Sequence, residues 1–331
     1  MRSAISILLF FFPIHFIFIK LKNLFYDNNL LRSAKINSTV ISVGNISLGG
    51  SGKTPFTISL SNFLYKKGFS VGIVTRGYGR KDSSYDFLLD NHSWRECGDE
   101  ALVIKNNISK SIPVYISKNK IYAAKELSKM GCDIIILDDA FQHRKIFRDI
   151  DIVLLSPDEL MHKNQKTFPY GLLREPFSNI DRADLIISTK ANLYNENNSA
   201  KSVLSLKTNF HDQLLCSIKN SKINIKEVSK MDGLLSICGI GKPESFHNSL
   251  KSLDIKPLES LTFPDHHNFN KKDIDSLVRK IKKRGITAII CTEKDWVKLI
   301  SFMDDIVIPI YAIRLNYSLN KDIEESILRL L

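Results

Sequence analysis

The chain has 331 residues and carries 47 Lys and Arg against 35 Asp and Glu, which gives a formal net charge of +12. Its composition is 44% hydrophobic and 25% charged with few Gly and Pro residues, which excludes a disordered tail or a fibrous protein. The length favours two α/β lobes, or one lobe with a large insertion, and the charge suits an anionic partner unless it reflects a lysine-rich composition alone.

The first element is an apolar segment, Ala4 to Ile19, with Arg2 before it and Lys20 after it. Sixteen helical residues rise about 24 Å against a hydrocarbon core of about 30 Å, so a membrane span and an anchor in one leaflet are both open. A cleaved signal peptide is a third interpretation, although no small-x-small cleavage site precedes Lys20. Basic and apolar residues continue to position 37, so we expect residues 1–37 to hold the protein on an anionic membrane surface, with the rest on the cytoplasmic side.

Strand-like and helix-like segments alternate along the rest of the chain, which is typical of a mainly parallel sheet with crossover helices. In residues 38–191 the pattern predicts strands at Thr39 to Val43, Val71 to Thr75, Asp133 to Leu137, Asp151 to Leu155 and Asp184 to Ser188, and helices at Thr54 to Lys67 and Asn119 to Met130. Residues 192–230 lose this rhythm and are expected to form a β-ribbon linker. In residues 231–331 a second alternation predicts strands at Gly233 to Cys238, Thr287 to Cys291 and Val307 to Ile310, and helices near Glu244 to Leu253 and Lys271 to Lys283.

A glycine-rich run lies between the first of these strands and the first helix, and it reads Gly49-Gly50-Ser51-Gly52-Lys53-Thr54. Its glycines let backbone N–H groups turn toward phosphate oxygens, at the positive end of a helix. Lys53 reaches the β- and γ-phosphates, and the Thr54 hydroxyl can bind Mg²⁺. The run departs from G-x-x-x-x-G-K-[ST] because Ser47 stands at the position of the first glycine. We predict a phosphate-binding P-loop that takes ATP with Mg²⁺.

A second motif is the apolar strand that ends in Asp138 and Asp139. Ligands of open α/β sheets bind at the carboxyl ends of the strands, where these two carboxylates lie. One carboxylate can hold Mg²⁺ directly or through water, and the other can orient it. The predicted metal site therefore consists of Thr54, Asp138 and Asp139.

These motifs predict an α/β fold with a P-loop NTPase-like, doubly wound, mainly parallel sheet. A second, smaller α/β lobe and an N-terminal membrane-associated helix complete the expected fold. The expected domains are an anchor at 1–37, a P-loop kinase core at 38–191, the ribbon linker at 192–230 and a C-terminal α/β lobe at 231–331.

Further blocks carry a resemblance that runs nearly end to end. They are Val43 to Ile46 before the P-loop, Arg76 to Gly79, Gly98-Asp99-Glu100, Asp138 to His143, Leu173 to Pro176, Gly239 to Glu244, Phe263 to His267 and Thr292 to Asp295. In this order they resemble the tetraacyldisaccharide 4'-kinase family, the lipid A 4'-kinases of Gram-negative bacteria.

The resemblance implies transfer of the ATP γ-phosphate to the 4'-hydroxyl of a tetraacylated glucosamine disaccharide 1-phosphate, with Mg²⁺, at the cytoplasmic face of the bacterial inner membrane. Asp99 matches the family's catalytic aspartate, so it is the expected base for the hydroxyl proton, and His266 is its expected partner. Adjacent residues point in different directions, so only one of His266 and His267 is expected to face the cleft, and the resemblance favours His266 because the Asp-His pair is the more constant part of the family's motif. The resemblance also places Gln142, His143, Arg174 and Glu175 around the nucleotide and its phosphates, with Arg174 suited to neutralising the transferred group.

A membrane-associated regulatory ATPase or GTPase switch is the alternative function. A guanine-reading [NT]-K-x-D motif would favour it, but Thr189-Lys190-Ala191-Asn192 ends in Asn. Nucleic acid is not an expected partner, because no basic motif with interleaved aromatic residues accompanies the positive charge.

Overall fold

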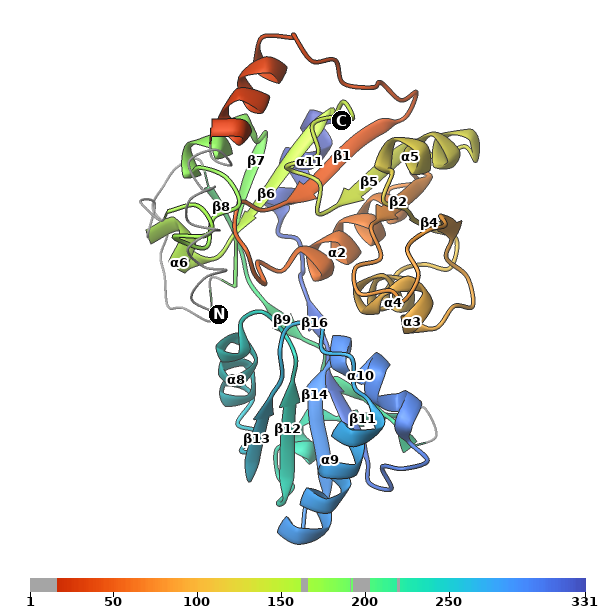
Figure 1. Cartoon of the computed structure of the whole chain (residues 1–331), viewed down its shortest axis with the longest axis vertical. Coiled ribbons are helices and arrows are strands. Elements are labelled where there is room, and N and C mark those ends of the chain that lie inside the picture. Colours follow the sequence, from red (N-terminus) through yellow and green to blue (C-terminus); the bar gives the residue numbers. More distant parts are fainter. Residues whose placement is uncertain (1–16, 162–165, 191, 193–202, 219–220) are drawn as a thin grey trace, which may run out of the picture.

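The structure is a computed structural model that describes residues 17–161, 166–190, 192, 203–218 and 221–331. Figure 1 shows two lobes arranged end to end along the long axis, each built around its own sheet. Most neighbouring strands in both sheets run parallel, so the mainly parallel α/β fold predicted from the sequence is confirmed.

The sheet of the first lobe has the strand order β3-β4-β2-β5-β1-β6-β7-β8. Its strands are β1 (Thr39–Gly44), β2 (Val71–Thr75), β3 (Phe87–Leu88), β4 (Val114–Ile116), β5 (Ile134–Asp138), β6 (Ile150–Leu155), β7 (Leu185–Thr189) and β8 (Val203–Leu206). The central strands β1, β2, β5 and β6 are almost completely buried, as their continuous apolar runs require of a sheet covered on both faces. The pairing of Val43 with Asp138 places the end of β1 and the end of β5 at the same edge of the sheet.

Helices cover both faces of this sheet. They are α2 (Lys53–Lys66), α3 (Trp94–Cys97), α4 (Asp99–Asn107), α5 (Lys120–Lys129), α6 (Pro157–Met161) and the 3₁₀ helix η1 (Phe177–Arg182). Helix α2 buries Phe56, Leu60 and Leu64, which recur every fourth residue and pack with α4 on one face. Helix α5 packs on the opposite face through Ala123, Ala124 and Leu127. The sheet is therefore doubly wound, as expected.

The sheet of the second lobe has the order β11-β10-β15-β14-β12-β13. Its strands are β10 (Gln213–Cys216), β11 (Ser221–Asn224), β12 (Leu234–Cys238), β13 (Glu259–Thr262), β14 (Ala288–Thr292) and β15 (Ile310–Ile313), and its helices are α7 (Ile225–Val228), α8 (Pro243–Ser252), α9 (Lys271–Arg284), α10 (Glu293–Leu299) and the 3₁₀ helix η4 (Ile300–Phe302). Asn270 caps α9 by accepting from the backbone N–H of Asp273, and Gly285 ends it in the left-handed conformation. The strand expected at Val307 to Ile310 lies a few residues later, as β15.

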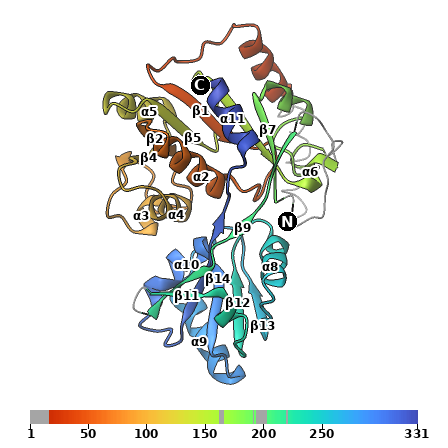
Figure 2. The same ribbon diagram turned by 180° about the vertical axis from the view of Figure 1, so that it is seen from behind.

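The chain does not pass once from the first lobe through a linker to the second lobe, as expected from the sequence. Strand β8 falls in the range expected for the linker, but it pairs with β7 and extends the first sheet. After β15, β16 (Leu315–Asn316) pairs with β9 (Asn209–Phe210), and α11 (Lys321–Leu330) returns to the first lobe, as Figure 2 shows from behind. Its residues Ile323 and Ile327 join the core of the first lobe. The C-terminal helix therefore packs on the first lobe and not on the second. The domain boundaries stay a prediction.

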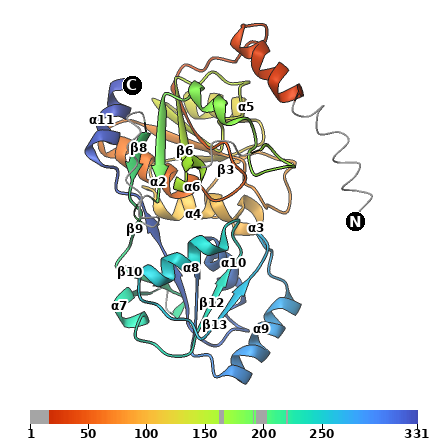
Figure 3. The ribbon, with the colours of Figure 1, turned by 90° about the vertical axis from the view of Figure 1, so that its left-hand side faces the viewer.

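Residues 17–27 are helical and lie on the first lobe at the end away from the second, as Figure 3 shows. Lys22 donates to the backbone oxygen of Gln142 at 3.3 Å, and Asp27 pairs with Arg144 at 2.7 Å. Most of the expected anchor, Ala4 to Ile19, lies outside the described residues. In the part of the chain that the structure describes, the helices are too short or too polar to cross a membrane.

Candidate active site

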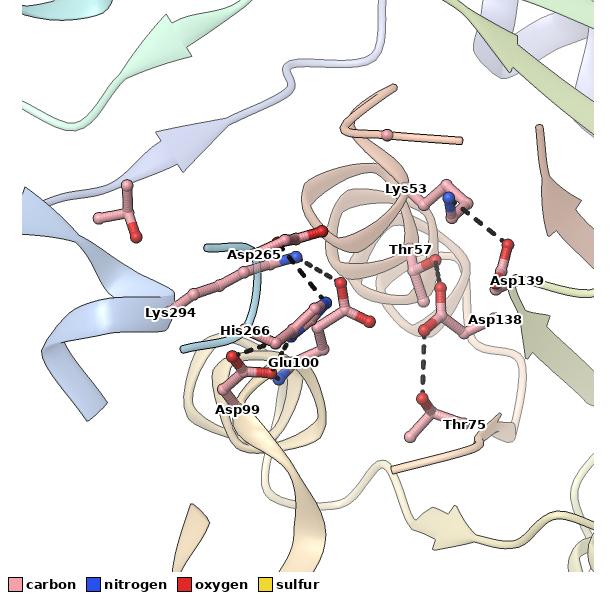
Figure 4. A network of polar contacts seen from close by, with 12 residues as sticks. Lys53, Thr57, Thr75, Asp99, Glu100, Asp138, Asp139, Asp265, His266 and Lys294 are labelled. Carbon is pink, nitrogen blue, oxygen red and sulfur yellow. Dashed lines mark hydrogen bonds and ion pairs between the residues drawn. The ribbon is translucent and has the colours of Figure 1, made fainter. Parts of the chain in front are cut away.

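A cavity of about 730 Å³ lies between the two lobes. One wall consists of the P-loop and the end of β5, and the other includes the loop after β12, the start of α8 and the loop that carries His266. All the predicted P-loop residues, Gly49, Gly50, Ser51, Gly52, Lys53 and Thr54, line it. Figure 4 shows the polar contacts, with Lys53, Asp138 and Asp139 on one side of α2 and Asp99 and His266 on the other.

The P-loop joins the end of β1 to the start of α2. Gly52 precedes α2 in the left-handed conformation, with a φ of 81°, and a Cβ atom there would overlap the Tyr317 hydroxyl. The Lys53 ammonium lies 3.2 Å from the side-chain oxygen of Asn45 and 3.4 Å from a carboxylate oxygen of Asp139. The loop thus brings its lysine to the carboxylates at the end of β5.

Asp138 and Asp139 differ in their surroundings. Asp138 is buried and accepts hydrogen bonds from the hydroxyls of Thr75 at 3.2 Å and Thr57 at 3.4 Å. Burial and the nearby Glu100 carboxylate raise the pKa of Asp138 to about 6. A cation bound beside Asp138 would stabilise the ionised carboxylate and lower its pKa.

Asp139 instead lies among cations. Its backbone has a positive φ of 49°, and the Arg174 guanidinium donates to its two oxygens at 2.8 and 2.9 Å. Burial opposes ionisation of Asp139, but Lys53 and Arg174 outweigh it and hold the pKa of this carboxyl below its usual range. Asp139 therefore links the P-loop lysine to Arg174, which lies in the loop after position 166.

The side chains on the P-loop wall suit Mg²⁺ bound together with phosphate. Mg²⁺ prefers oxygen ligands and usually binds through one or two carboxylates plus substrate phosphates. Asp138 and Thr54 line the cavity beside the P-loop and supply such oxygens. Among the described residues, no group of three or more His, Cys, Asp or Glu side chains could hold a metal by itself.

Asp99 and His266 meet across the lobe boundary. Asp99 begins α4 in the first lobe, and its carboxylate oxygens lie 3.0 and 3.1 Å from Nδ1 of His266 in the second lobe. The same carboxylate accepts from the Glu100 backbone N–H at 2.8 Å and from Lys298 at 3.2 Å. Burial opposes ionisation of Asp99, but His266 and Lys298 outweigh it and keep the pKa of Asp99 below its usual range.

Of this pair, His266 lines the cavity, whereas Asp99 lies behind it and is 4% exposed. The His266 backbone has a positive φ of 55°, which is strained for a residue other than glycine, and its ring lies 4.7 Å from the ring of Tyr78. Burial lowers the pKa of His266, but the hydrogen bond to Asp99 and the negative charges of Asp99 and Glu100 together outweigh burial and raise the pKa overall. The side chain next in sequence, His267, does not line the cavity; its Nε2 lies 3.0 Å from Asp273 and its ring stacks on Phe263.

The residues expected around the nucleotide separate into two groups. Arg174 lines the cavity, whereas Gln142, His143 and Glu175 do not. Gln142 donates to the backbone oxygen of Asn45 at 2.8 Å and to Glu175 at 2.7 Å, and burial lowers the pKa of His143 to about 4. In this conformation Gln142 and Glu175 connect the segment before the P-loop to the loop of Arg174.

Several polar residues of the site were not among the predicted site residues. Lys294 forms an ion pair with Glu100, and both line the cavity. Lys190 donates to the Gly50 backbone oxygen at 3.0 Å and to the Ser245 hydroxyl at 2.9 Å, which ties the P-loop to α8. The blocks that contain Glu100, Lys190 and Lys294 are visible in the sequence, but nothing in the sequence places them at the P-loop.

Asn192 has a structural contact that bears on the alternative function as a GTPase switch. Its amide donates to the backbone oxygen of Thr208 at 2.9 Å and accepts from the Thr208 N–H at 2.8 Å. The polar atoms that would have to read a guanine base are therefore used within the protein.

Comparison with known proteins gives one consistent result. A family model described as tetraacyldisaccharide-1-P 4'-kinase matches residues 5–331. A tetraacyldisaccharide 4'-kinase of Syntrophus aciditrophicus is 32% identical over 358 residues, covering 100% of this chain and 94% of that protein, and one of Colwellia psychrerythraea is 33% identical over 285 residues, covering 85% and 80%. A crystal structure described as the apo form of LpxK from Aquifex aeolicus in complex with ATP matches with a TM-score of 0.75 at 29% identity, over 98% of each chain. The resemblance seen in the sequence is confirmed, and the chain belongs to the tetraacyldisaccharide-1-P 4'-kinase family.

Proposed function

We propose that this chain transfers the γ-phosphate of ATP to the 4'-hydroxyl of a tetraacyldisaccharide 1-phosphate, and that Asp99 and His266 receive the hydroxyl proton. Membership of the kinase family supports the reaction. The observation that carries the assignment of residues is the Asp99–His266 pair, whose His266 lines the same cavity as the P-loop. The P-loop and the proposed proton acceptor thereby face one space between the lobes.

The P-loop side of the cavity binds and orients the triphosphate. Its backbone N–H groups and the start of α2 supply positive charge, and Lys53 and Arg174 add cationic side chains around Asp139. Asp138 and Thr54 would hold Mg²⁺, which neutralises charge on the phosphates when bound. Phosphoryl transfer depends mainly on such positioning and charge stabilisation.

The opposite side of the cavity handles the proton. A sugar hydroxyl has a high pKa, so a base must take its proton as the phosphoryl group arrives. The hydroxyl proton passes to Nε2 of His266, while ionised Asp99 accepts the hydrogen bond from Nδ1–H and stabilises the imidazolium. This order differs from the sequence-based expectation that Asp99 is the base, because the cavity exposes the imidazole and the carboxylate lies behind it.

The test is phosphorylation of a defined acceptor. Purified protein, Mg²⁺ and γ-labelled ATP are incubated with a tetraacylated glucosamine disaccharide 1-phosphate in detergent micelles. We expect a labelled bisphosphorylated glycolipid and little ATP hydrolysis without the acceptor. ATP or GTP hydrolysis that does not depend on the acceptor, with no labelled lipid, would support the regulatory switch instead.

Replacement of Asp138 should change the response to Mg²⁺. In Asp138→Ala we expect the Mg²⁺ concentration for half-maximal rate to rise several-fold and the saturated rate to fall, because a cavity-facing carboxylate near the P-loop is lost. The measurement is the initial rate against free Mg²⁺ at saturating ATP. Asp133→Ala, at the residue immediately before β5, is the control. An unchanged Mg²⁺ response in Asp138→Ala would make Asp138 structural.

We further propose that the enzyme works on an anionic membrane surface at the cytoplasmic face of the inner membrane, where an acylated substrate resides. The helix at residues 17–27 supports this, because Ile17, Phe18, Leu21, Leu24 and Phe25 are exposed. Burial of such side chains in lipid is favourable, and interspersed lysines favour anionic headgroups.

Deletion of residues 1–20 should therefore release the protein from vesicles that contain anionic lipid. We expect the KM for the acylated acceptor to rise at least several-fold while the KM for ATP changes little, since the nucleotide does not need the membrane. Co-sedimentation with vesicles and the two KM values measure this. Equal sedimentation of the full-length and shortened proteins would show that residues 1–20 are not needed for membrane binding.

A further inference from the structure

Lys298 is a buried cation at the lobe boundary. Its side chain in α10 has no exposed surface, and its ammonium lies 3.2 Å from Asp99 and 3.3 Å from Asp295, both of which are also buried. A buried charge is costly unless it is paired. Lys298 thus joins a carboxylate of the first lobe to one of the second, away from the triphosphate side of the cavity.

Asp295 connects this lysine to the backbone that carries His266. It accepts from the Gly239 N–H at 3.0 Å and from the Thr292 hydroxyl at 2.7 Å. The Gly239 carbonyl in turn accepts from the His266 N–H at 3.2 Å. One continuous set of contacts therefore fixes both the backbone of His266 and, through Asp99, its ring.

The charges that face His266 come from each element packed around it. They are Asp99 and Glu100 on α4, Lys294 on α10, and Asp265 in its own loop at 3.8 Å, while Tyr78 contributes a neutral ring. Lys298 on α10 lies behind Asp99 and contacts its carboxylate. Three carboxylates near one imidazole favour its protonated form. A base needs the neutral form. Lys294 opposes this effect on His266 directly, and Lys298 is a second cation that acts on the Asp99 carboxylate.

We propose that Lys298 is a positioning residue for the kinase reaction, an inference that rests on the proposed function. Lys298 holds Asp99 against Nδ1 of His266 across the lobe boundary, and it keeps the pair able to accept a proton. Lys294 already forms a close ion pair with Glu100, whereas Lys298 contacts the carboxylate of the pair itself. Lys298 does not line the cavity, so its effect passes through Asp99.

The test compares two variants in the buried cluster of Lys298, Asp99 and Asp295, one that removes a positive charge and one that removes a negative charge. In Lys298→Met, loss of a cation favours the protonated pair, so we expect the acidic limb of the kcat/KM profile to move up by about one pH unit. We also expect kcat to fall at least about tenfold while the KM for ATP stays within about twofold. Lys298→Arg keeps the charge and should restore the position of the limb.

Asp295→Asn is the matched control, because it disturbs the same cluster but removes an anion. Its acidic limb should move to lower pH, whereas a purely structural role predicts lost activity in both variants without opposite shifts. If Lys298→Met does not fold, as judged by circular dichroism, Lys298→Arg and Asp295→Asn decide the question. Identical limbs in wild type and in all folded variants would overturn the proposal.

A second measurement does not depend on turnover. NMR titration of the protein labelled in its histidine rings, with the His266 signals assigned from His266→Gln, should show the same shift in Lys298→Met. A wild-type protein that phosphorylates no acceptor would refute the proposed function, yet the titration would still report on Lys298. Wild-type activity together with an unshifted His266 titration would refute the role of Lys298 alone.

Discussion

Lys53→Ala is expected to lower kcat/KM at least about 100-fold while the protein stays folded, because the change removes a charge aimed at the triphosphate. The fold should tolerate the loss. The Lys53 side chain is 14% exposed, its partner Asn45 is neutral, and Asp139 keeps its two hydrogen bonds from Arg174. Steady-state rates against ATP and acceptor measure the effect, and thermal unfolding reports on stability.

Lys66→Ala provides the control for this change. Lys66 lies in the last turn of the same helix α2 and is exposed, so its loss alters net charge equally without touching the cavity. We expect nearly normal turnover in Lys66→Ala. Near-normal turnover in Lys53→Ala as well would contradict the assignment of the loop to ATP.

The Asp99–His266 pair gives the second large effect. Asp99→Ala and His266→Ala should each lower kcat by about 10²–10⁴-fold with little change in affinity for ATP, because the loss lies in proton transfer. The double variant should lose little more than the worse single variant, since residues that act as one unit are not additive. Rates from single-turnover experiments, with ATP affinity measured separately, provide the comparison.

The pH profile separates the two roles within this pair. Because Asp99 raises the pKa of His266, the wild-type rate should increase with pH through a limb above the ordinary histidine pKa, as the imidazole loses its proton. His266→Ala should lack this limb, and in Asp99→Ala it should move to lower pH. His267→Ala is the control and should keep the wild-type limb, because His267 pairs with Asp273 outside the cavity. Losses that multiply fully in the double variant would show that Asp99 and His266 act independently.

Much of the central sheet could be predicted because its signals are local. Continuous apolar runs fixed β1, β2, β5, β6 and β7 to within about a residue, since strands buried on both faces need no alternation. Short or unusual elements escaped prediction. Strand β4 has only three residues, and β8 sits in a polar stretch that indicated a linker. Their places in the sheet depend on neighbours far away in the sequence.

The sequence by itself determined the family, the P-loop, and the two carboxylates at the end of β5, because each is written in adjacent residues. Only the tertiary structure decided how Asp99 and His266 meet, 167 positions apart in the chain. It also decided that His266 faces the cavity and His267 does not, and that Gln142 and Glu175 bond to each other. The physical reason is that local propensity fixes helices and strands, whereas side-chain direction and charge pairing depend on packing between two lobes.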